Sequence, residues 1–194
     1  MKTLTIFDWD DTLYPTIHTI MQGEDNDINY ELVDDKIYKL FELILKYSLI
    51  LIISDASKAW ILKSLQDLEK TRQLFNDNQI KIISTYDIII LYNELYEDKI
   101  YYLNENKKIK IFDIIDRLFK DYNNIISVGD SKKEYSALSY LSKKSTNKYK
   151  LFKNIKFFNY PTTNLLIEEL KLLCRYYPEI YKSEKCEDLL INIF

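Results

Sequence analysis

The chain has 194 residues, of which 47% are hydrophobic and 29% are charged. This length and balance are typical of a globular protein with one substantial core. The formal net charge of −3 excludes a bulk attraction to nucleic acid or anionic lipid, although a local basic patch could bind either. No apolar run reaches the ~18 residues of a membrane span, and no signal-peptide pattern opens the chain. We therefore expect an intracellular, cytoplasmic protein without a membrane partner.

Five short runs rich in Ile, Leu, Val and Phe predict strands that are buried on both faces. They are Leu4–Phe7, Leu49–Ile53, Ile80–Ile83, Ile125–Val128 and Ile155–Phe158. Apolar residues at helical spacing predict helices at Asp35–Tyr47, Lys58–Phe75, Ile111–Lys120, Lys133–Leu141 and Thr163–Tyr176, with a last helical turn at Glu184–Ile193. This alternation indicates an α/β fold, an open parallel sheet with helices on both faces. We expect one domain over residues 1–194, in which residues 162–194 form a C-terminal helical tail.

Polar side chains gather where the predicted strands end, which is the edge at which open parallel sheets bind ligands. Three aspartates, Asp8, Asp10 and Asp11, follow the first strand directly. Carboxylates this close repel one another unless a cation lies between them or one of them takes part in a reaction. The other strand ends add Ser54, Asp55, Gly129, Asp130 and Glu134, and lysines open the helix before the fourth strand. This set suits a phosphate group and a divalent cation.

The first two strand ends resemble motifs of the haloacid dehalogenase (HAD) superfamily of phosphohydrolases. The stretch "FDWDDTL" is similar to the first motif, D-x-D-x-T, at Asp8, Asp10 and Thr12. The stretch "LIISDAS" is similar to the second motif, a hydrophobic strand that ends in Ser54. In this family the second aspartate distinguishes phosphoryl transfer from dehalogenation, so Asp10 favours phosphoryl transfer.

The third and fourth motifs follow in the order of the family. Lys108 is our assignment for the third-motif lysine, with Lys107 and Lys110 as alternatives because a helix start is predicted only to within a few residues. The stretch "SVGDSKKE" resembles the fourth motif, G-D-x-x-x-D, with Glu134 in place of the last aspartate. The resemblance implies a Rossmann-like sheet of five strands in the order 5-4-1-2-3. The segments at both cap positions are short, which implies a minimal cap and an open site.

The resemblance also implies a role for each matched residue. Asp8 would be the nucleophile that forms an aspartyl-phosphate, and Asp10 the general acid and base. Mg²⁺ would be held by Asp8, by Asp130 and by the backbone carbonyl of Asp10. Ser54 and Lys108 would bind the phosphoryl group.

Two further residues would act in support, Thr12 on the loop after the first strand and Glu134 on the ligands of the metal. The chain is thus expected to be a Mg²⁺-dependent phosphomonoesterase whose phosphorylated substrate is not specified. One alternative is a polynucleotide or nucleotide phosphatase. The other is a catalytically silent HAD-fold module that docks through its tail, Lys171–Phe194. The sequence does not predict an oligomeric state.

The remaining segments carry weaker signals. The acidic stretch Gly23–Asp35 is expected to be a solvated loop, with a specific binding element as the alternative. His18 is expected to be an ordinary surface or partly buried residue, with a substrate contact as the alternative. The tyrosine-rich segment Thr85–Glu105 is expected to pack, with a substrate cleft as the alternative. The lysines from Lys143 to Lys156 predict a solvated face, away from the site. Nucleic-acid binding there is an alternative that topology does not favour. Lys132 and Lys133 follow Asp130 and could meet a large anionic substrate.

Overall fold

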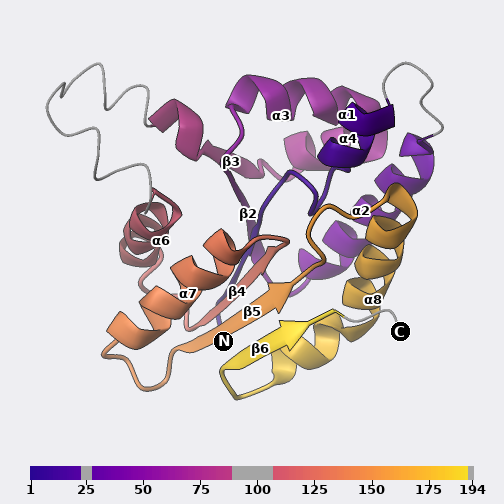
Figure 1. Cartoon of the computed structure of the whole chain (residues 1–194). Coiled ribbons are helices and arrows are strands. Elements are labelled where there is room, and N and C mark those ends of the chain that lie inside the picture. Colours follow the sequence, from indigo (N-terminus) through magenta and orange to yellow (C-terminus); the bar gives the residue numbers. More distant parts are fainter. Residues whose placement is uncertain (23–27, 89–106, 192–194) are drawn as a thin grey trace, which may run out of the picture.

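The computed structural model describes residues 1–22, 28–88 and 107–191. Its strands form one six-stranded sheet in the order β3-β2-β1-β4-β5-β6, in which every pairing is parallel. The strands are β1 (Thr3–Phe7), β2 (Leu49–Ser54), β3 (Lys81–Ser84), β4 (Asn124–Gly129), β5 (Leu151–Lys156) and β6 (Glu187–Leu190). The helices are α1 (Thr16–Gln22), α2 (Tyr30–Ile44), α3 (Lys58–Ser64), α4 (Glu69–Asp77), α6 (Lys107–Leu118), α7 (Lys132–Lys144) and α8 (Thr163–Lys182), with a 3-10 turn, η1, at Leu65–Asp67. Figure 1 shows this arrangement.

The sheet has six strands, so the expected sheet of five strands was wrong in number. Read from the opposite edge, the order is 6-5-4-1-2-3, and the added strand lies beyond β5. A helical turn was expected at Glu184–Ile193, but its described part contains this strand, β6, and residues 192–193 lie outside the described residues. Asp188 holds β6 in place, because its carboxylate accepts hydrogen bonds from Asn154 Nδ2 of β5 at 3.0 Å and from Tyr135 OH of α7 at 3.1 Å. The C-terminal tail is therefore only partly helical.

Strand β5 begins at Leu151, four residues before the apolar run that predicted it. The prediction missed this first part because the middle of the strand is polar. Lys153 is fully buried, and its Nζ donates to Ile180 O and Ser183 O, each at 2.7 Å. These carbonyls belong to the end of α8, where helical carbonyls lack partners within the helix. Lys150 is also buried and pairs with Asp116. The expectation of a solvated lysine face is therefore wrong for Lys150 and Lys153.

The helix expected over Lys58–Phe75 is interrupted, since α3 ends at Ser64 and α4 starts at Glu69. The start of α4 is capped from α2, where Asp34 accepts from Lys70 N and Thr71 N, both at 2.8 Å. Asp34 is only 4% exposed. The acidic stretch was thus only partly a loop, because α2 begins at Tyr30. Residues 23–27 of that stretch lie outside the described residues.

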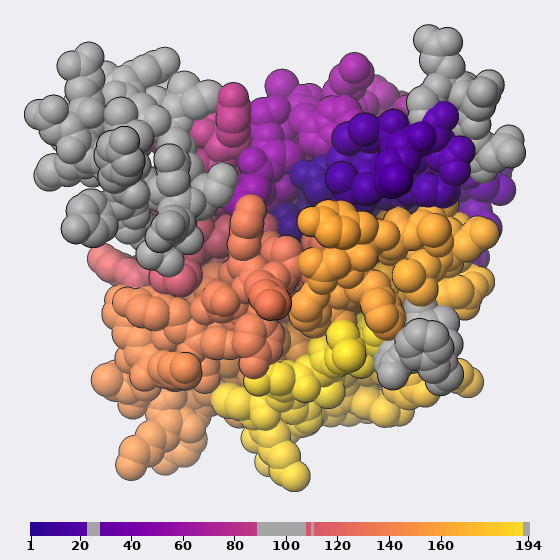
Figure 2. Space-filling view, in the orientation of Figure 1, coloured from indigo at the N-terminus to yellow at the C-terminus, as the bar shows by residue number. Residues whose placement is uncertain are grey.

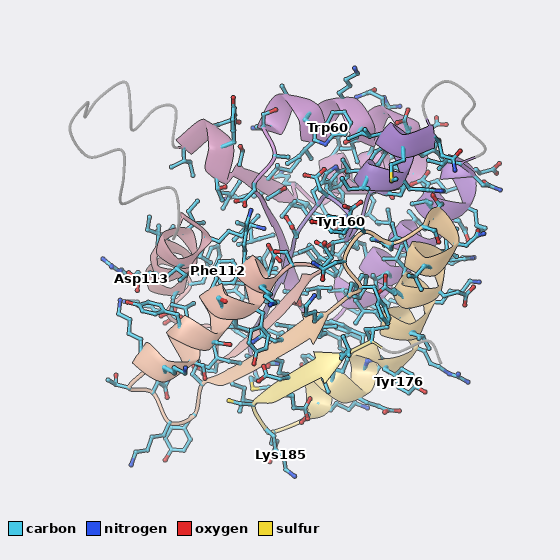
Figure 3. The ribbon with its side chains drawn as sticks, viewed as in Figure 1. Trp60, Phe112, Asp113, Tyr160, Tyr176 and Lys185 are labelled. Carbon is cyan, nitrogen blue, oxygen red and sulfur yellow. The ribbon has the colours of Figure 1, made fainter. Side chains whose placement is uncertain are left out.

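Helices cover both faces of the sheet and make two clusters of buried residues. One face packs against α2, α4 and α8, and the other against α6 and α7. Phe112 of α6, which belongs to the second cluster, is labelled in Figure 3. Central strands bury both faces, which explains their continuous hydrophobic runs. On the first face, Thr5 Oγ1 of β1 hydrogen-bonds to Tyr177 OH of α8 and to Ser48 Oγ, both at 2.7 Å. No helix in the described parts of the chain is long and apolar enough to cross a membrane.

The carboxyl ends of β1, β2 and β4 lie side by side at the sheet edge that carries the predicted site. In the register of the sheet, Phe7 lies opposite both Ile52 and Val128, and Asp8 N extends the ladder by donating to Val128 O at 3.0 Å. The next residues of β1, β2 and β4 therefore emerge together at their carboxyl ends. Helix α1 then lies against the start of α8, as Figure 2 shows, where His18 Nδ1 is 2.7 Å from Thr163 Oγ1.

Removing the cap that α2 supplies to α4 should destabilise the fold. We predict that Asp34→Ala lowers the free energy of unfolding by about 1–2 kcal/mol, because two N–H groups at the start of α4, of which that of Thr71 is buried, lose their acceptor. Urea denaturation measures this loss. The matched control is Asp35→Ala, which removes the neighbouring carboxylate and its lysine pairs at a cost of about 0.5 kcal/mol. Equal losses in the two variants would contradict the capping role.

A buried carboxylate on α8 should make stability depend on pH. Glu169 is fully buried, its Oε1 accepts from Phe158 N at 2.6 Å, and Oε2 has no hydrogen-bond partner among the described residues. Burial raises the pKa of Glu169 from 4.5 to about 7; the Phe158 N–H opposes this rise, and the charge of Asp130 adds to it. Between these pH values the unfolded chain ionises first, so stability falls as pH rises.

We predict that Glu169→Gln removes this penalty. The unfolding free energy of the variant relative to the unmodified chain should rise between pH 4.5 and pH 7 and level off above that range. Urea denaturation at a series of pH values measures the difference. Glu168→Gln, which removes the exposed neighbouring carboxylate that pairs with Lys171, is the control. A difference that is flat across this range for Glu169→Gln would contradict the prediction.

Candidate active site

The centre of the site is a buried lysine placed between two carboxylates. Asp8 follows β1, Lys108 lies in the first turn of α6, and Glu134 lies in the first turn of α7. Lys108 Nζ is 3.1 Å from Asp8 Oδ2 and also bonds to Glu134 Oε1. Burial alone would lower the pKa of Lys108, but the charges of Asp8 and Glu134 outweigh it and raise that pKa above its ordinary value. Lys108 is thus a fixed ammonium ion.

Glu134 is held by its own helix start and by the only described glycine. Its Oε2 accepts from Ser131 N at 3.0 Å, and the Ser131 side chain accepts from the backbone at the start of α7, so the two residues form a capping box. Glu134 Oε2 also bonds to the Ser131 hydroxyl. A Cβ on Gly129 would lie 2.5 Å from Glu134 Cγ. Position 129 therefore needs glycine for space, because the side chain of Glu134 packs directly onto that backbone. Burial opposes ionisation of Glu134, but the charge of Lys108 lowers its pKa overall.

Asp130 follows β4 and is held from both sides, by the loop after β1 and by β5. The Thr12 hydroxyl accepts from Asp130 N at 3.1 Å and donates to Asp130 Oδ1 at 3.3 Å. From β5, Lys156 Nζ donates to the carbonyl oxygen of Asp130. Lys156 belongs to the lysine stretch that was expected to lie away from the site, and for this residue the expectation is wrong. It lies opposite Gly129 at the carboxyl end of β5.

The cluster carries more negative than positive charge. Ligand oxygens of Asp8, Asp130 and Glu134 all lie within 4.8 Å of one another, and Lys108 is the ammonium among them. Burial, reinforced by Glu134 and Asp130 and opposed by Lys108, raises the pKa of Asp8 to about 8. Burial and the charges of Glu134 and Asp11 raise the pKa of Asp130 to about 6.

This charge imbalance fits a cation. Asp8 Oδ1 is buried and has no hydrogen-bond partner in the described chain. A buried carboxylate oxygen without a donor is costly, and a divalent cation beside it would supply the missing interaction. Such a cation would also favour the ionised forms of Asp8 and Asp130. The donor set consists of carboxylate oxygens, which suits a hard ion such as Mg²⁺.

Asp10 lies outside this cluster and is held by different partners. Its Oδ1 accepts from Trp60 Nε1 at 2.9 Å and from Thr16 Oγ1 at 2.5 Å. The metal role expected for Asp10 rested on its backbone carbonyl, and its carboxylate is not among the clustered oxygens. The sequence did not predict Trp60 or Thr16 as partners of Asp10, because a hydrogen bond from an indole N–H or a hydroxyl to a carboxylate leaves no recognisable pattern in the sequence.

The segment after β2 contributes Ser54 and Asp55. Ser54 is buried, and its Oγ accepts from Ala56 N at 3.1 Å. Asp55 accepts from Thr85 Oγ1 at 2.5 Å and from Lys133 Nζ at 2.6 Å. Lys133, expected to meet an anionic substrate, is 64% exposed at its side chain and bridges the segments that follow β2 and β4.

The third aspartate of the first motif has a structural role. Asp11 has φ 55°, in the left-handed region that aspartate tolerates better than most residues. It is buried, and its Oδ1 accepts from Ile17 N at 2.9 Å in the first turn of α1. Burial raises the pKa of Asp11, while the N–H of Ile17 opposes this rise. The carboxylate therefore shapes the turn between β1 and α1.

Two predictions fall partly outside the described residues. The side chains of Lys107 and Lys110 are not described, so the choice of Lys108 rests on its own contacts. Residues 89–106 contain most of the tyrosine-rich segment and are not described either. At its start, Tyr86 is 50% exposed.

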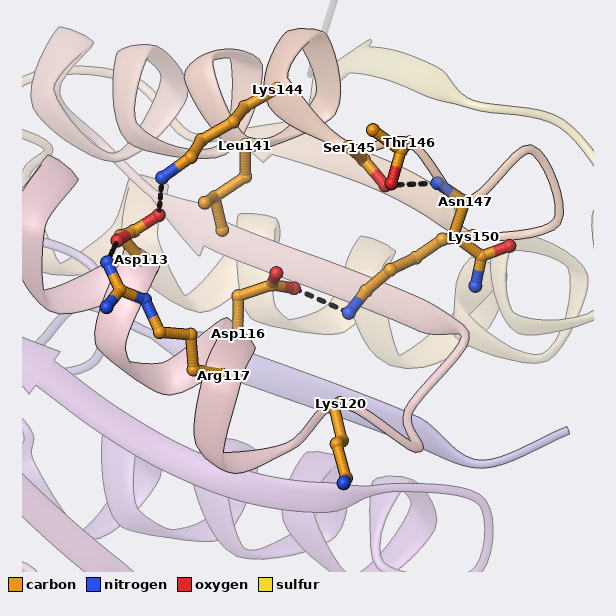
Figure 4. Close-up of a pocket in the computed structure, with 10 residues that line it drawn as sticks. All are labelled: Asp113, Asp116, Arg117, Lys120, Leu141, Lys144, Ser145, Thr146, Asn147 and Lys150. Atoms are coloured by element: carbon orange, nitrogen blue, oxygen red, sulfur yellow. Dashed lines mark hydrogen bonds and ion pairs between the residues drawn. The ribbon is translucent and has the colours of Figure 1, made fainter.

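A hollow of about 480 Å³ lies between α6, α7 and the turn before β5, at the opposite end of these helices from Lys108 and Glu134 (Figure 4). Its lining includes Lys120 and three cations that are paired with aspartates, Arg117, Lys144 and Lys150. Arg117 and Lys144 both bond to Asp113, and Lys150 bonds to Asp116. This pairing reduces the attraction of the hollow for an anion.

Comparisons of the chain with protein-family models, with curated proteins and with solved structures found no match. A fold of this kind supports many unrelated activities, so only the residues of the site can indicate the function. The site consists of a lysine and three carboxylates at the carboxyl ends of β1 and β4 and the starts of α6 and α7.

Adding a methyl group at Gly129 should disturb Glu134. We predict that Gly129→Ala lowers the free energy of unfolding by about 1–3 kcal/mol, because the new Cβ overlaps the Glu134 side chain. A double-mutant cycle with Glu134→Ala, measured by urea denaturation, isolates this contact. The cost of Gly129→Ala should be smaller when Glu134 has been shortened. The same cost in both backgrounds would contradict the assigned contact.

Proposed function

We propose that this protein is a Mg²⁺-dependent phosphomonoester hydrolase of the HAD superfamily that acts through an aspartyl-phosphate on Asp8. The observation that carries the proposal is the buried cluster of Asp8, Asp130 and Glu134 around Lys108. Its excess negative charge and the unpartnered Asp8 Oδ1 call for a cation. The motifs that resemble the family supply the residues of this cluster in the order of the family.

The chemistry proceeds in two steps. In the first, a carboxylate oxygen of Asp8 attacks the phosphorus, the bond to the leaving oxygen breaks, and Asp10 gives that oxygen a proton. In the second, Asp10 takes a proton from water, and the water oxygen attacks the phosphorus of the aspartyl-phosphate. Inorganic phosphate leaves and Asp8 is regenerated.

The surrounding residues bind the transferring group. Lys108 supplies a positive charge between Asp8 and the phosphoryl oxygens, and the Ser54 hydroxyl donates to one of those oxygens. Asp8 and Asp130 would hold Mg²⁺, while Thr12 and Glu134 keep these groups in place through the contacts described above. Bound Mg²⁺ would neutralise charge on the carboxylates and on the phosphoryl group.

The two alternative functions have less support. A polynucleotide phosphatase would benefit from free cations near its site, but Lys133 is engaged by Asp55. The hollow that contains Arg117, Lys144 and Lys150 lies at the opposite end of α6 and α7, and these three cations are paired with aspartates. A silent docking module would use the tail, yet Leu173 and Tyr177 of α8 are buried in the core. The intact charged cluster favours a catalytic role over the silent module.

The nucleophile can be tested directly. We predict that 4-nitrophenyl phosphate is hydrolysed in the presence of Mg²⁺, that EDTA abolishes the activity, and that Asp8→Asn reduces kcat by at least about 10³-fold, because the amide cannot form the acyl phosphate. Asp11→Asn is the matched control, since an amide oxygen can still accept from Ile17 N. Turnover that survives Asp8→Asn would overturn the mechanism.

A second measurement does not depend on the choice of substrate. Beryllofluoride mimics a phosphoryl group on a carboxylate, and ¹⁹F NMR detects its bound form. Binding that requires Mg²⁺, persists in Asp11→Asn and is lost in Asp8→Asn would support the acceptor role of Asp8. Lack of binding by the folded, unmodified chain, together with lack of turnover, would overturn the proposed function.

A further inference from the structure

The indole of Trp60 contacts the carboxylate of Asp10 across two elements that are far apart in the sequence. Trp60 lies on α3, above the carboxyl ends of the strands (Figure 3), and its Nε1 donates to Asp10 Oδ1 at 2.9 Å. The helix start is fixed as well, because Trp60 N donates to Ser57 Oγ at 3.1 Å.

Aromatic packing holds the indole ring. The ring of Trp60 meets Tyr14 edge to face, with ring centroids 6.1 Å apart, and Tyr14 stacks on Tyr30 at 5.7 Å. The hydroxyl of Tyr14 donates to Asp67 Oδ2 at 2.7 Å, which ties this ring to the segment after α3. The indole N–H is therefore a donor whose position is set before any ligand binds, and such preorganisation is what precise proton transfer requires.

Both donors to Asp10 act on the same oxygen. Thr16 Oγ1 of α1 also donates to Oδ1, at 2.5 Å. Among the described residues, Oδ2 of Asp10 has no hydrogen-bond donor. Two donors on Oδ1 leave Oδ2 as the atom that can carry and transfer a proton, and they fix the direction in which it points.

We propose that Trp60, together with Thr16, is a positioning residue that aims Oδ2 of Asp10 at the leaving oxygen of a phosphomonoester. This inference rests on the proposed function. Its consequence is selective, because a poor leaving group needs the proton while its bond to phosphorus breaks, whereas a good leaving group departs as a stable anion. Loss of the indole N–H should therefore slow esters of poor leaving groups most.

The experiment compares Trp60→Phe with the unmodified chain on phenyl phosphate and 4-nitrophenyl phosphate. We expect kcat/KM to fall by at least about 10-fold for phenyl phosphate and by less than about 3-fold for 4-nitrophenyl phosphate. Thr16→Val, which removes the second donor, should change the ratio in the same direction. Thr16→Ser retains a hydroxyl and should restore the ratio.

The matched control is Trp9→Phe. Trp9 Nε1 donates at 2.9 Å to Ser64 Oγ, which lies on the same helix as Trp60, so this variant removes an equivalent donor that does not touch Asp10. Any loss that it causes should be equal for the two esters. Circular dichroism and urea denaturation establish that each variant is folded.

The outcomes separate the two proposals. Equal losses for the two esters in folded Trp60→Phe, or no loss for either, would overturn the positioning role while leaving the proposed function intact. A selective loss in Trp9→Phe as large as that in Trp60→Phe would overturn it as well. An unmodified chain that turns over neither ester and binds no beryllofluoride would overturn the proposed function, and this inference with it.

Discussion

Charge balance at the carboxyl edge of the sheet constrains everything around it. Three carboxylates, on Asp8, Asp130 and Glu134, approach within 4.8 Å where water is largely excluded, and Lys108 offsets part of their repulsion. Such an arrangement costs free energy that the rest of the fold must supply. It persists because the groups that hold it are themselves fixed by regular structure. The remaining excess of negative charge is also what makes this edge suited to a cation, through which a phosphate can bind.

Several elements contribute one fixed contact each to that edge. Thr12 holds Asp130 from the loop after β1, Lys156 reaches the Asp130 carbonyl from β5, and the start of α7 holds Glu134 against Gly129. No single element could place these groups alone. Parallel strands in register deliver them together, which is the general reason that ligands bind at this edge.

Local patterns predicted most of the framework. Strands β1, β2 and β4 are continuous apolar runs because both of their faces are covered. The polar residues at their ends predicted that Asp8, Ser54, Asp130 and Glu134 form one group, to which the family resemblance added Lys108 at the start of the helix before β4. That prediction of proximity is met for Asp8, Lys108, Asp130 and Glu134. The roles of these residues in catalysis stay a prediction.

The failures share a different cause, which is that the deciding partner is distant in sequence. Lys153 makes β5 look polar, yet it is buried because α8 offers carbonyls to its ammonium group. The helix expected through Ser64 breaks where Asp34 caps α4 from another helix. Trp60 looks like an apolar position of a helix until the fold places it on Asp10. Propensity and periodicity carry no information about such tertiary contacts.

The hydrogen bond between Thr5 and Tyr177 joins residues that are 172 positions apart. During synthesis, β1 emerges well before α8, the helix that covers one of its faces. Contacts between segments this far apart raise the contact order of the fold, which slows folding. Until α8 is made, one apolar face of β1 stays uncovered in the nascent chain. The charged edge that begins at Asp8 is also completed later than β1, since Lys108, Asp130 and Glu134 must all be synthesised before its charges can balance.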